Sequence, residues 1–334
     1  MNSSTSSSDA AFGRCLVACF GTLGLGVLLI LALMVAVDPY DSGRFGWLGI
    51  DGVTDKIEVT ADASRARDPH FDSAIFGDST AQILNPAGLS QATGVRFVQL
   101  VAPGADPYGH LAILDFFLRH HPRVGALVIA IDEPWCTRDP APSPRNSFPF
   151  WLYEGSPLEY ASRLFSWSAI DRLVQRIAIG LGKRERMNPD GFWSYEEVWP
   201  PGERRPVIAP REESPPFIGK VSDVFPIQPL LGDVIRKLPA DVPVVLLVPP
   251  TFYTVVPAPG SLAAVEHAAC TAAFRRLVAG RPHSNFIDYR VDNALTRDPA
   301  NFADLIHYRA KIARKMEQGI ADSIRLGEAA KIDF

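Results

Sequence analysis

The chain has 334 residues, 47% of them hydrophobic and 21% charged, which is enough for one large domain or two modest ones. Its formal net charge of -4, with no basic patch interleaved with aromatic residues, argues against nucleic acid as a partner. The 29 prolines and 25 glycines are spread over predicted loops, so the chain is not a low-complexity array.

An uncharged stretch near the N-terminus is predicted to anchor the protein in a membrane. Residues 1–14 begin with a run rich in Ser and Thr and are expected to form a disordered cytoplasmic tail. Residues 15–37 carry no charge and are long enough to cross a bilayer as one helix. Arg14 precedes this span, and Asp38 and Asp41 follow it. The positive-inside rule therefore predicts a protein of the cytoplasmic (inner) membrane whose N-terminus is inside and whose main part is extracytoplasmic.

A cleaved signal peptide is the alternative for this stretch. Such a signal has a shorter apolar core and small residues at its cleavage site, whereas Met34 and Val35 stand where small residues are needed. We therefore predict an uncleaved, single-pass anchor.

The rest of the chain is predicted to be a stem followed by an α/β domain. Residues 38–70 are expected to form the stem, because they begin with a turn-rich run and continue as a polar segment along the domain surface. Residues 71–334 then alternate between short apolar runs and amphipathic stretches. Strands are predicted at 71–76, 96–101, 126–131, 244–248 and 285–289, and helices at 80–91, 107–120, 261–279 and 308–324. Continuous apolar strands are typical of a parallel sheet covered on both faces. We therefore predict a three-layer αβα sandwich with a parallel sheet of about five strands.

The run Gly77-Asp78-Ser79 directly follows the first predicted strand. Open α/β sheets bind ligands outside the carboxyl ends of their strands, so Ser79 lies where chemistry is expected. The amides of the next helical turn are available there to a negatively charged oxygen. Ser79 is therefore a candidate nucleophile. Capping of the following helix by Asp78 and Ser79 is the alternative.

A second motif, Asp304-Leu305-Ile306-His307, precedes the last predicted helix. The spacing of three places Asp304 and His307 on one side of a helical turn. Asp304 can then hold one nitrogen of the imidazole while the other faces a serine. The sequence thus predicts a triad of Ser79, His307 and Asp304.

The two motifs, in this order at the two ends of an α/β pattern, resemble those of the SGNH (GDSL-type) hydrolase superfamily. The resemblance implies that Gly104, which follows the second strand, supplies an oxyanion-hole amide together with Ser79. A glycine needed only for the turn is the alternative. The family's third block ends in an Asn donor, whereas this chain has Asp132 there. An ionised carboxylate cannot donate a hydrogen bond, so this position departs from the family's pattern.

A long insertion at residues 133–231 holds five of the six tryptophans. Residues 157–181 within it are predicted to be helical, and the rest is expected to be irregular, as in lids and small subdomains. Trp135, Trp151, Trp193 and Trp199 either stack on sugar rings or form the insertion's own core. The further candidates for contact with a substrate are Asp78, Asp132, Trp135 and Tyr253.

The cysteines leave one question open. Cys15 and Cys19 belong to the membrane span, whereas Cys136 and Cys270 could pair in an oxidising compartment, although the sequence does not show that they are close. No Cys/His cluster has the spacing of a zinc site, and neither a metal nor an organic cofactor is expected.

The resemblance also implies a function. Membrane-anchored relatives in alginate acetylation and teichoic-acid D-alanylation move acyl groups onto cell-surface polymers, so the expected activity is O-acyl transfer, notably O-acetyl transfer, to an envelope or exported polysaccharide. It implies a partner as well, a multi-spanning membrane-bound O-acyltransferase that supplies the acyl group. A glycan O-acetyl esterase and a non-catalytic polysaccharide-binding scaffold are the alternatives.

Overall fold

The structure is a computed structural model that describes residues 6–54, 59–137, 148–208 and 216–327. The chain divides into two compact units. We call Asp55–Gly155 with Met187–Phe334 the sheet unit, and Met1–Thr54 with Ser156–Arg186 the helical unit. Each unit is described by itself.

The sheet unit is built on five parallel strands in the order β2-β1-β3-β4-β5. Their bounds are β1 Ser73–Gly77, β2 Phe97–Val101, β3 Leu127–Ala130, β4 Val244–Val248 and β5 Asn285–Asp288. Every residue of β1 to β4 is buried, as expected for continuous apolar strands covered on both faces. The prediction of an α/β fold with a five-stranded parallel sheet is confirmed.

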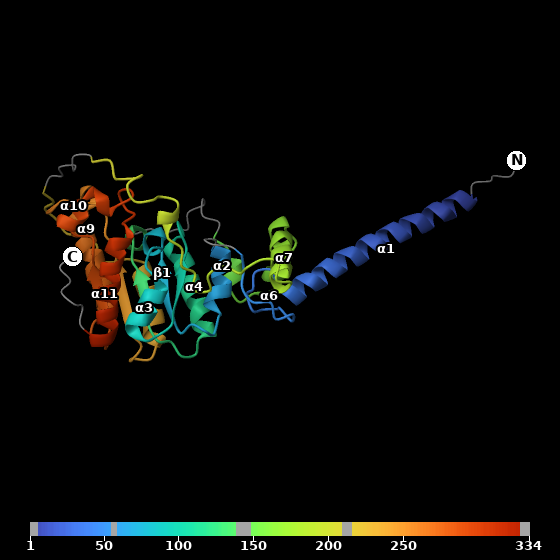
Figure 1. The fold of residues 1–334 in the computed structure, drawn as a ribbon, viewed down its shortest axis with the longest axis horizontal. Helices are drawn as coiled ribbons and strands as arrows, with labels where there is room; N and C mark the ends of the chain where they lie inside the picture. The colour runs from blue at the N-terminus through green and yellow to red at the C-terminus, as the bar shows by residue number, and fades with distance from the viewer. Residues whose placement is uncertain (1–5, 55–58, 138–147, 209–215, 328–334) are drawn as a thin grey trace. The chain divides into compact units, whose positions relative to one another are not determined.

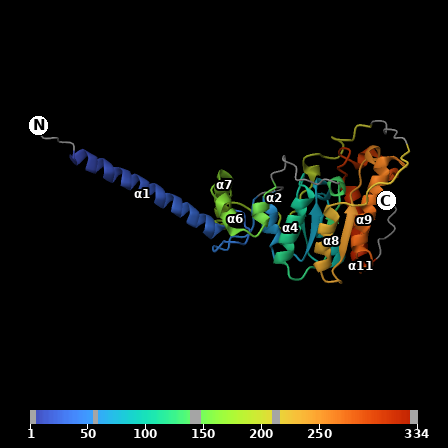
Figure 2. The same ribbon diagram turned by 180° about the vertical axis from the view of Figure 1, so that it is seen from behind.

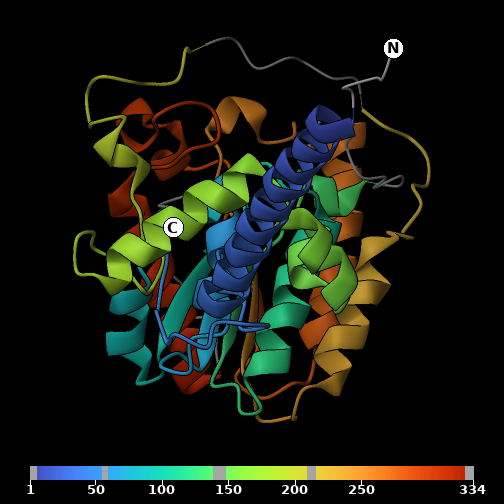
Figure 3. The ribbon, with the colours of Figure 1, turned by 90° about the vertical axis from the view of Figure 1, so that its right-hand side faces the viewer.

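Helices pack on both faces of this sheet. Helices α3 and α11 lie on one face (Figure 1), and α4, α8 and α9 lie on the other (Figure 2). Figure 3 shows the sheet between these two groups. Side chains alternate along each strand, so Ile75 belongs to the α11 side, in the cluster with Ile312 and Met316, while Phe76 meets Phe117 of α4. The helices of this unit are α2 Val59–Ala66, α3 Pro86–Thr93, α4 Pro107–His120, α5 Phe150–Tyr153, α8 Ile227–Lys237, α9 Leu262–Val278, α10 Ala294–Arg297 and α11 Ala310–Leu326.

The predicted single helix over 80–91 is wrong. A short 3-10 turn, η1 (Ser79–Ala81), is followed by a break, and α3 begins at Pro86. Asn85 caps α3 by accepting hydrogen bonds from the amides of Ala87 and Gly88. Proline has no amide hydrogen and suits the first turn of a helix, so Asn85-Pro86 starts a new helix instead of continuing the old one.

A disulfide between Cys136 and Cys270 answers the question that the sequence left open. Cys136 ends a 3-10 turn, η2 (Glu133–Cys136), that follows β3, and Cys270 lies on α9. Their Cα atoms are 5.6 Å apart. The bond therefore ties the start of the insertion to a helix that packs on β4 and β5.

The helical unit contains α1 (Ser6–Val37), α6 (Pro157–Arg163) and α7 (Trp167–Gly180). In α1 the residues Ala11–Val37 have a mean hydropathy of 2.6 and are long and apolar enough to cross a membrane. Residues 1–5 lie outside the described residues, but from Ser6 the predicted disordered tail is helical. Helices extend cooperatively, so the span continues backward into this polar stretch.

The predicted stem is divided between the two units. Residues 38–54 pack with 156–186 of the insertion in the helical unit, and α2 belongs to the sheet unit. A buried ion pair of 2.8 Å joins Asp41 to Arg176 on α7, and the Tyr160 hydroxyl donates to Asp38. The predicted helix over 157–181 is two helices, because Ser166 caps a new start.

Candidate active site

The site forms at the carboxyl ends of the first three strands. Strand β1 ends at Gly77, where an added Cβ would lie 2.8 Å from the Cβ atoms of both Ala81 and Ala130. Real Cβ atoms do not approach so closely, so only glycine lets the chain turn here next to β3. Asp78 then caps η1 and presents Ser79 at the edge of the sheet.

Ser79, His307 and Asp304 form a continuous chain of hydrogen bonds. The distance from Ser79 Oγ to His307 Nε2 is 3.0 Å, and that from His307 Nδ1 to Asp304 Oδ2 is 2.7 Å. Serine and histidine are separated by 228 residues and come from opposite parts of the chain. The structure thus brings the three predicted residues together in the order that an activated serine requires.

The loop that carries Asp304 and His307 is not the predicted helical turn. Phe302 and Tyr308 pair in an antiparallel bridge, and the amide of Ala303 donates to the carbonyl of His307. The loop between them is closed by Asp304, whose Oδ1 accepts the amides of Ile306 and His307 at 2.9 Å and 2.8 Å. The carboxylate therefore both shapes the loop and holds the imidazole.

These bonds also fix the charge of Asp304. Partial burial by itself raises the pKa of this carboxyl, but the hydrogen bonds from the His307 ring and from the two amides together outweigh it and lower the pKa to about 2. Asp304 is therefore ionised at neutral pH. An ionised partner selects the imidazole tautomer with its proton on Nδ1 and leaves Nε2 able to accept a proton from Ser79.

Two aromatic rings of the insertion pack against the imidazole. The rings of Tyr195 and Trp199 each lie 5.3 Å from that of His307, edge to face. Arg309, directly before α11, donates to the carbonyls of Trp199 and Arg204 and holds this segment in place. The sequence had offered Trp199 either for sugar stacking or for the insertion's own core. Tyr195 and Arg309 were not predicted, because neither belongs to a motif.

Two backbone amides converge on one carboxylate beside the serine. The amides of Ser79 and Gly104 donate to Asp78 Oδ1 at 2.6 Å and 2.5 Å. Gly104 has a φ of +70°, a left-handed conformation that favours glycine. These are the two amides that the resemblance implied for an oxyanion hole, and a carboxyl oxygen of Asp78 already lies between them.

Asp132 lies next to this carboxylate. Burial is the main reason that the pKa of Asp132 stands well above the ordinary carboxyl value, and the charge of Asp78 and a hydrogen bond with it add to the effect. His110 of α4 is buried nearby, close enough to Asp78 for the two groups to interact electrostatically. Burial lowers the pKa of His110, opposed by the charges of Asp78 and Asp106.

The two remaining candidates have different surroundings. Trp135 is 1% exposed, between His110 and Phe274, so its ring belongs to the interior and not to a surface that a sugar can reach. Tyr253 is half-buried under the guanidinium of Arg297. Its neighbour Phe252 donates an amide hydrogen to the carbonyl of Leu305, so this segment borders the loop that carries Asp304 and His307.

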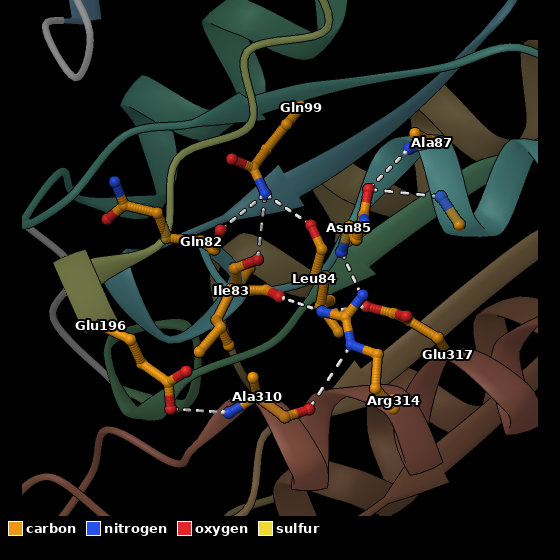
Figure 4. Close-up of polar contacts among 12 residues, drawn as sticks. Gln82, Ile83, Leu84, Asn85, Ala87, Gln99, Glu196, Ala310, Arg314 and Glu317 are labelled. Carbon is orange, nitrogen blue, oxygen red and sulfur yellow. Dashed lines mark hydrogen bonds and ion pairs between the residues drawn. The ribbon is translucent and has the colours of Figure 1, made fainter. Parts of the chain in front are cut away.

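A buried network holds the segment that follows Ser79 (Figure 4). Gln99 of β2 interrupts an apolar strand, and its Nε2 donates to the carbonyls of Gln82 and Leu84 at 2.8 Å. From α11, Arg314 donates to the carbonyl of Ile83, and Glu317 accepts the amide of Asn85. The segment 82–85 is thereby fixed from two sides.

No group of His, Cys, Asp and Glu in the described part of the chain is arranged to hold a metal ion. Comparison with known proteins finds no family model, curated protein or solved structure that matches this chain.

Proposed function

We propose that the protein is a membrane-anchored serine O-acyltransferase that acts on a polysaccharide of the cell envelope. The observation that carries this proposal is the hydrogen-bonded chain from Ser79 through His307 to Asp304. A serine hydroxyl is a weak nucleophile unless an adjacent base takes its proton, and an imidazole oriented by an ionised carboxylate is such a base.

The reaction then has two halves. Ser79 Oγ attacks the acyl carbonyl while its proton passes to His307 Nε2, and the donor group leaves with that proton. An acyl-enzyme remains. A sugar hydroxyl next attacks the acyl carbon and gives its proton to His307, which returns it to Ser79 as the ester leaves. Both halves pass through an oxyanion for which the amides of Ser79 and Gly104 are the donors.

The substrate class rests on the resemblance to SGNH enzymes. Gly77-Asp78-Ser79 ends β1, and Asp304 and His307 lie in the loop before α11, which is the order of the family's two outer motifs. On this proposal the acyl group, notably acetyl, arrives from a multi-spanning membrane-bound O-acyltransferase. One span, such as α1, cannot carry an acyl group across a bilayer.

The same proposal places the sheet unit outside the cytoplasm. The disulfide between Cys136 and Cys270 supports this orientation, because such bonds persist in oxidising compartments and are rare in the cytoplasm. The single positive charge of Arg14 before the span favours the same side.

A hydrolase with the same triad would remove acetyl groups instead. The packing of Tyr195 and Trp199 against His307 favours transfer, because a covered base admits less water to the acyl-enzyme. Incubation with a soluble acyl ester and a glycan acceptor decides between them. Acylated glycan that depends on Ser79 supports transfer, whereas acetate release from acetylated glycan, without acceptor acylation, identifies a deacetylase.

Labelling by a serine-directed fluorophosphonate tests catalysis itself. We expect the full-length protein in detergent to be labelled, and Ser79→Ala and His307→Ala to lose the label. Ser162→Ala, which removes an exposed hydroxyl of α6, is the matched control and keeps it. Equal labelling of wild type and Ser79→Ala, or none of either, would support the scaffold function instead.

A further inference from the structure

The helical unit exposes an apolar stripe on α7. Trp167, Ile170, Val174, Ile177 and Leu181 recur at spacings of three and four, so they share one side of the helix. Trp167 is 85% exposed, Val174 59% and Leu181 64%. A different side of the helix, with Ala169, Leu173 and Arg176, is the buried one. The stripe is thus a second apolar face that the unit's own core does not cover.

Further exposed apolar residues lie level with the end of α1. The amide of Gly46 donates to the carbonyl of Val35, and that of Leu48 donates to the carbonyl of Ala36. These bonds hold Trp47, which is 80% exposed, beside the last turn of the helix. The apolar run 15–37 has a length of about 34 Å at 1.5 Å per residue, so its last turn reaches the edge of a hydrocarbon core of about 30 Å.

The stripe on α7 lies close to the same level. Tyr40, three residues beyond α1, is hydrogen-bonded to Ser168, the neighbour of Trp167. In Figures 1 and 2, α7 lies beside the C-terminal end of α1 and runs across its direction. A helix placed across a membrane span lies in the plane of the bilayer surface, as amphipathic interfacial helices do.

The charge of this region suits the surface of an anionic bilayer. The stretch 163–186 holds six basic and two acidic residues. Lys183, Arg184 and Arg186 follow the end of α7, and tryptophan next to basic residues is typical of membrane interfaces.

We propose that the stripe on α7, together with Trp47 and Leu48, inserts into the headgroup region of the leaflet at the C-terminal end of α1. The helical unit then contacts the membrane at two places, through the membrane-spanning helix α1 and through the interfacial helix α7. This inference rests on α1 being the membrane anchor and is independent of the chemistry at Ser79.

Tryptophan fluorescence tests the insertion directly, because α1 contains no tryptophan. The full-length protein is reconstituted into vesicles of phosphatidylcholine and phosphatidylglycerol whose acyl chains are brominated near the headgroup. We expect bromine to quench part of the emission, and the Trp47→Phe/Trp167→Phe variant to lose most of that quenching. The matched variant Trp151→Phe/Trp193→Phe removes two tryptophans of the sheet unit and keeps it.

Extraction with alkaline carbonate distinguishes the absence of a membrane span from the absence of an interfacial helix. Protein that carbonate removes from the vesicles has no membrane span, which would contradict the anchor and this inference together. Protein that resists extraction but has the same emission in brominated and ordinary lipid would overturn the interfacial helix alone. In that case the stripe packs on protein, either the sheet unit or a partner.

Discussion

The carboxylate of Asp78 accepts hydrogen bonds from the amides of Ser79 and Gly104, and a carboxyl group of Asp132 adjoins it. On the proposed mechanism, Asp78 Oδ1 stands where the oxyanion of the substrate forms, so the substrate must displace it. Burial and the neighbouring Asp78 raise the pKa of Asp132 and so favour its protonated form, and a protonated carboxyl can donate a hydrogen bond. Asp132 can therefore serve as the donor that the sequence had found missing.

This role predicts a change in the pH profile. Deprotonation of Asp132 removes the donor, so wild-type activity should fall as pH rises through the raised pKa. Asp132→Asn keeps a donor at every pH, and we expect it to retain activity and lose this decline. Asp78 and Glu133 face Asp132, and His110 faces Asp78, so titration of these groups also contributes to the pH profile. The activities of wild type and of each variant are therefore compared over the same pH range.

Asp132→Ala, measured in the same way, removes the carboxyl group and with it the donor, so we expect its activity to be low at every pH. Loss of one oxyanion donor costs about 3 kcal/mol, or roughly a hundredfold in kcat. Equal profiles for wild type and Asp132→Asn, together with full activity of Asp132→Ala, would show that Asp132 takes no part.

Single residues of the site were predictable where a motif marks them. Ser79, Asp304 and His307 follow from two short motifs in a fixed order. The raised pKa of Asp132 could not be predicted from the sequence, because it depends on burial and on the neighbouring Asp78, and a sequence shows neither. Tyr195 and Arg309 lack a motif, and only the folded insertion brings them to His307 and Trp199.

At the scale of elements, Gln99 connects β2 to the segment after Ser79 (Figure 4). We expect Gln99→Leu, which has a similar volume, to lower the free energy of unfolding by about 1–3 kcal/mol, because buried carbonyls lose their donor. Looser placement of Ser79 should also slow labelling by the fluorophosphonate. Denaturant unfolding and labelling rates measure the two effects.

Gln318→Leu is the control, because Gln318 is an exposed glutamine of α11 that bonds only its neighbour Asp322 among the described residues. It should leave both measurements unchanged. A Gln99→Leu protein with wild-type stability and labelling would mean that the segment holds itself without β2.

The strands were predicted to within about two residues, because continuous apolar runs bounded by turns leave little choice. Helices were less predictable. Asn85-Pro86 starts α3 within a stretch that had been expected to be continuous, and the short α2 and α8 were not predicted. Helix α7 lies within the stretch 157–181 that was predicted to be helical, and its apolar residue Val174 is exposed, because apolar periodicity does not distinguish a core from another apolar surrounding.

At the scale of the whole molecule, the disulfide links residues 134 positions apart. A bond that closes so long a loop typically contributes about 2–4 kcal/mol to stability. We expect Cys136→Ser/Cys270→Ser, or reduction of the native protein, to lower the free energy of unfolding by this amount. The measurement is the denaturant concentration at the midpoint of unfolding of the purified protein, which should fall. Cys15→Ser/Cys19→Ser removes the free thiols of α1 and should leave the midpoint unchanged. The same midpoint with and without reductant would contradict this contribution.

The division into two units was beyond sequence reasoning. The insertion 133–231 was expected to behave as one lid or subdomain, yet 156–186 joins the helical unit while the part after it packs on His307. Contacts such as Asp41 with Arg176 link positions that are 135 residues apart, and no local pattern reports such pairs.

The separation of Ser79 from His307 by 228 residues has a consequence for the growing chain. Synthesis proceeds from the N-terminus, so the segment with Ser79 and Gly104 emerges long before the loop with Asp304 and His307. On the proposed mechanism, a partly synthesised chain carries a serine without its base. On the same proposal, acyl chemistry begins only after the loop that follows β5 has been made and has folded against Ser79.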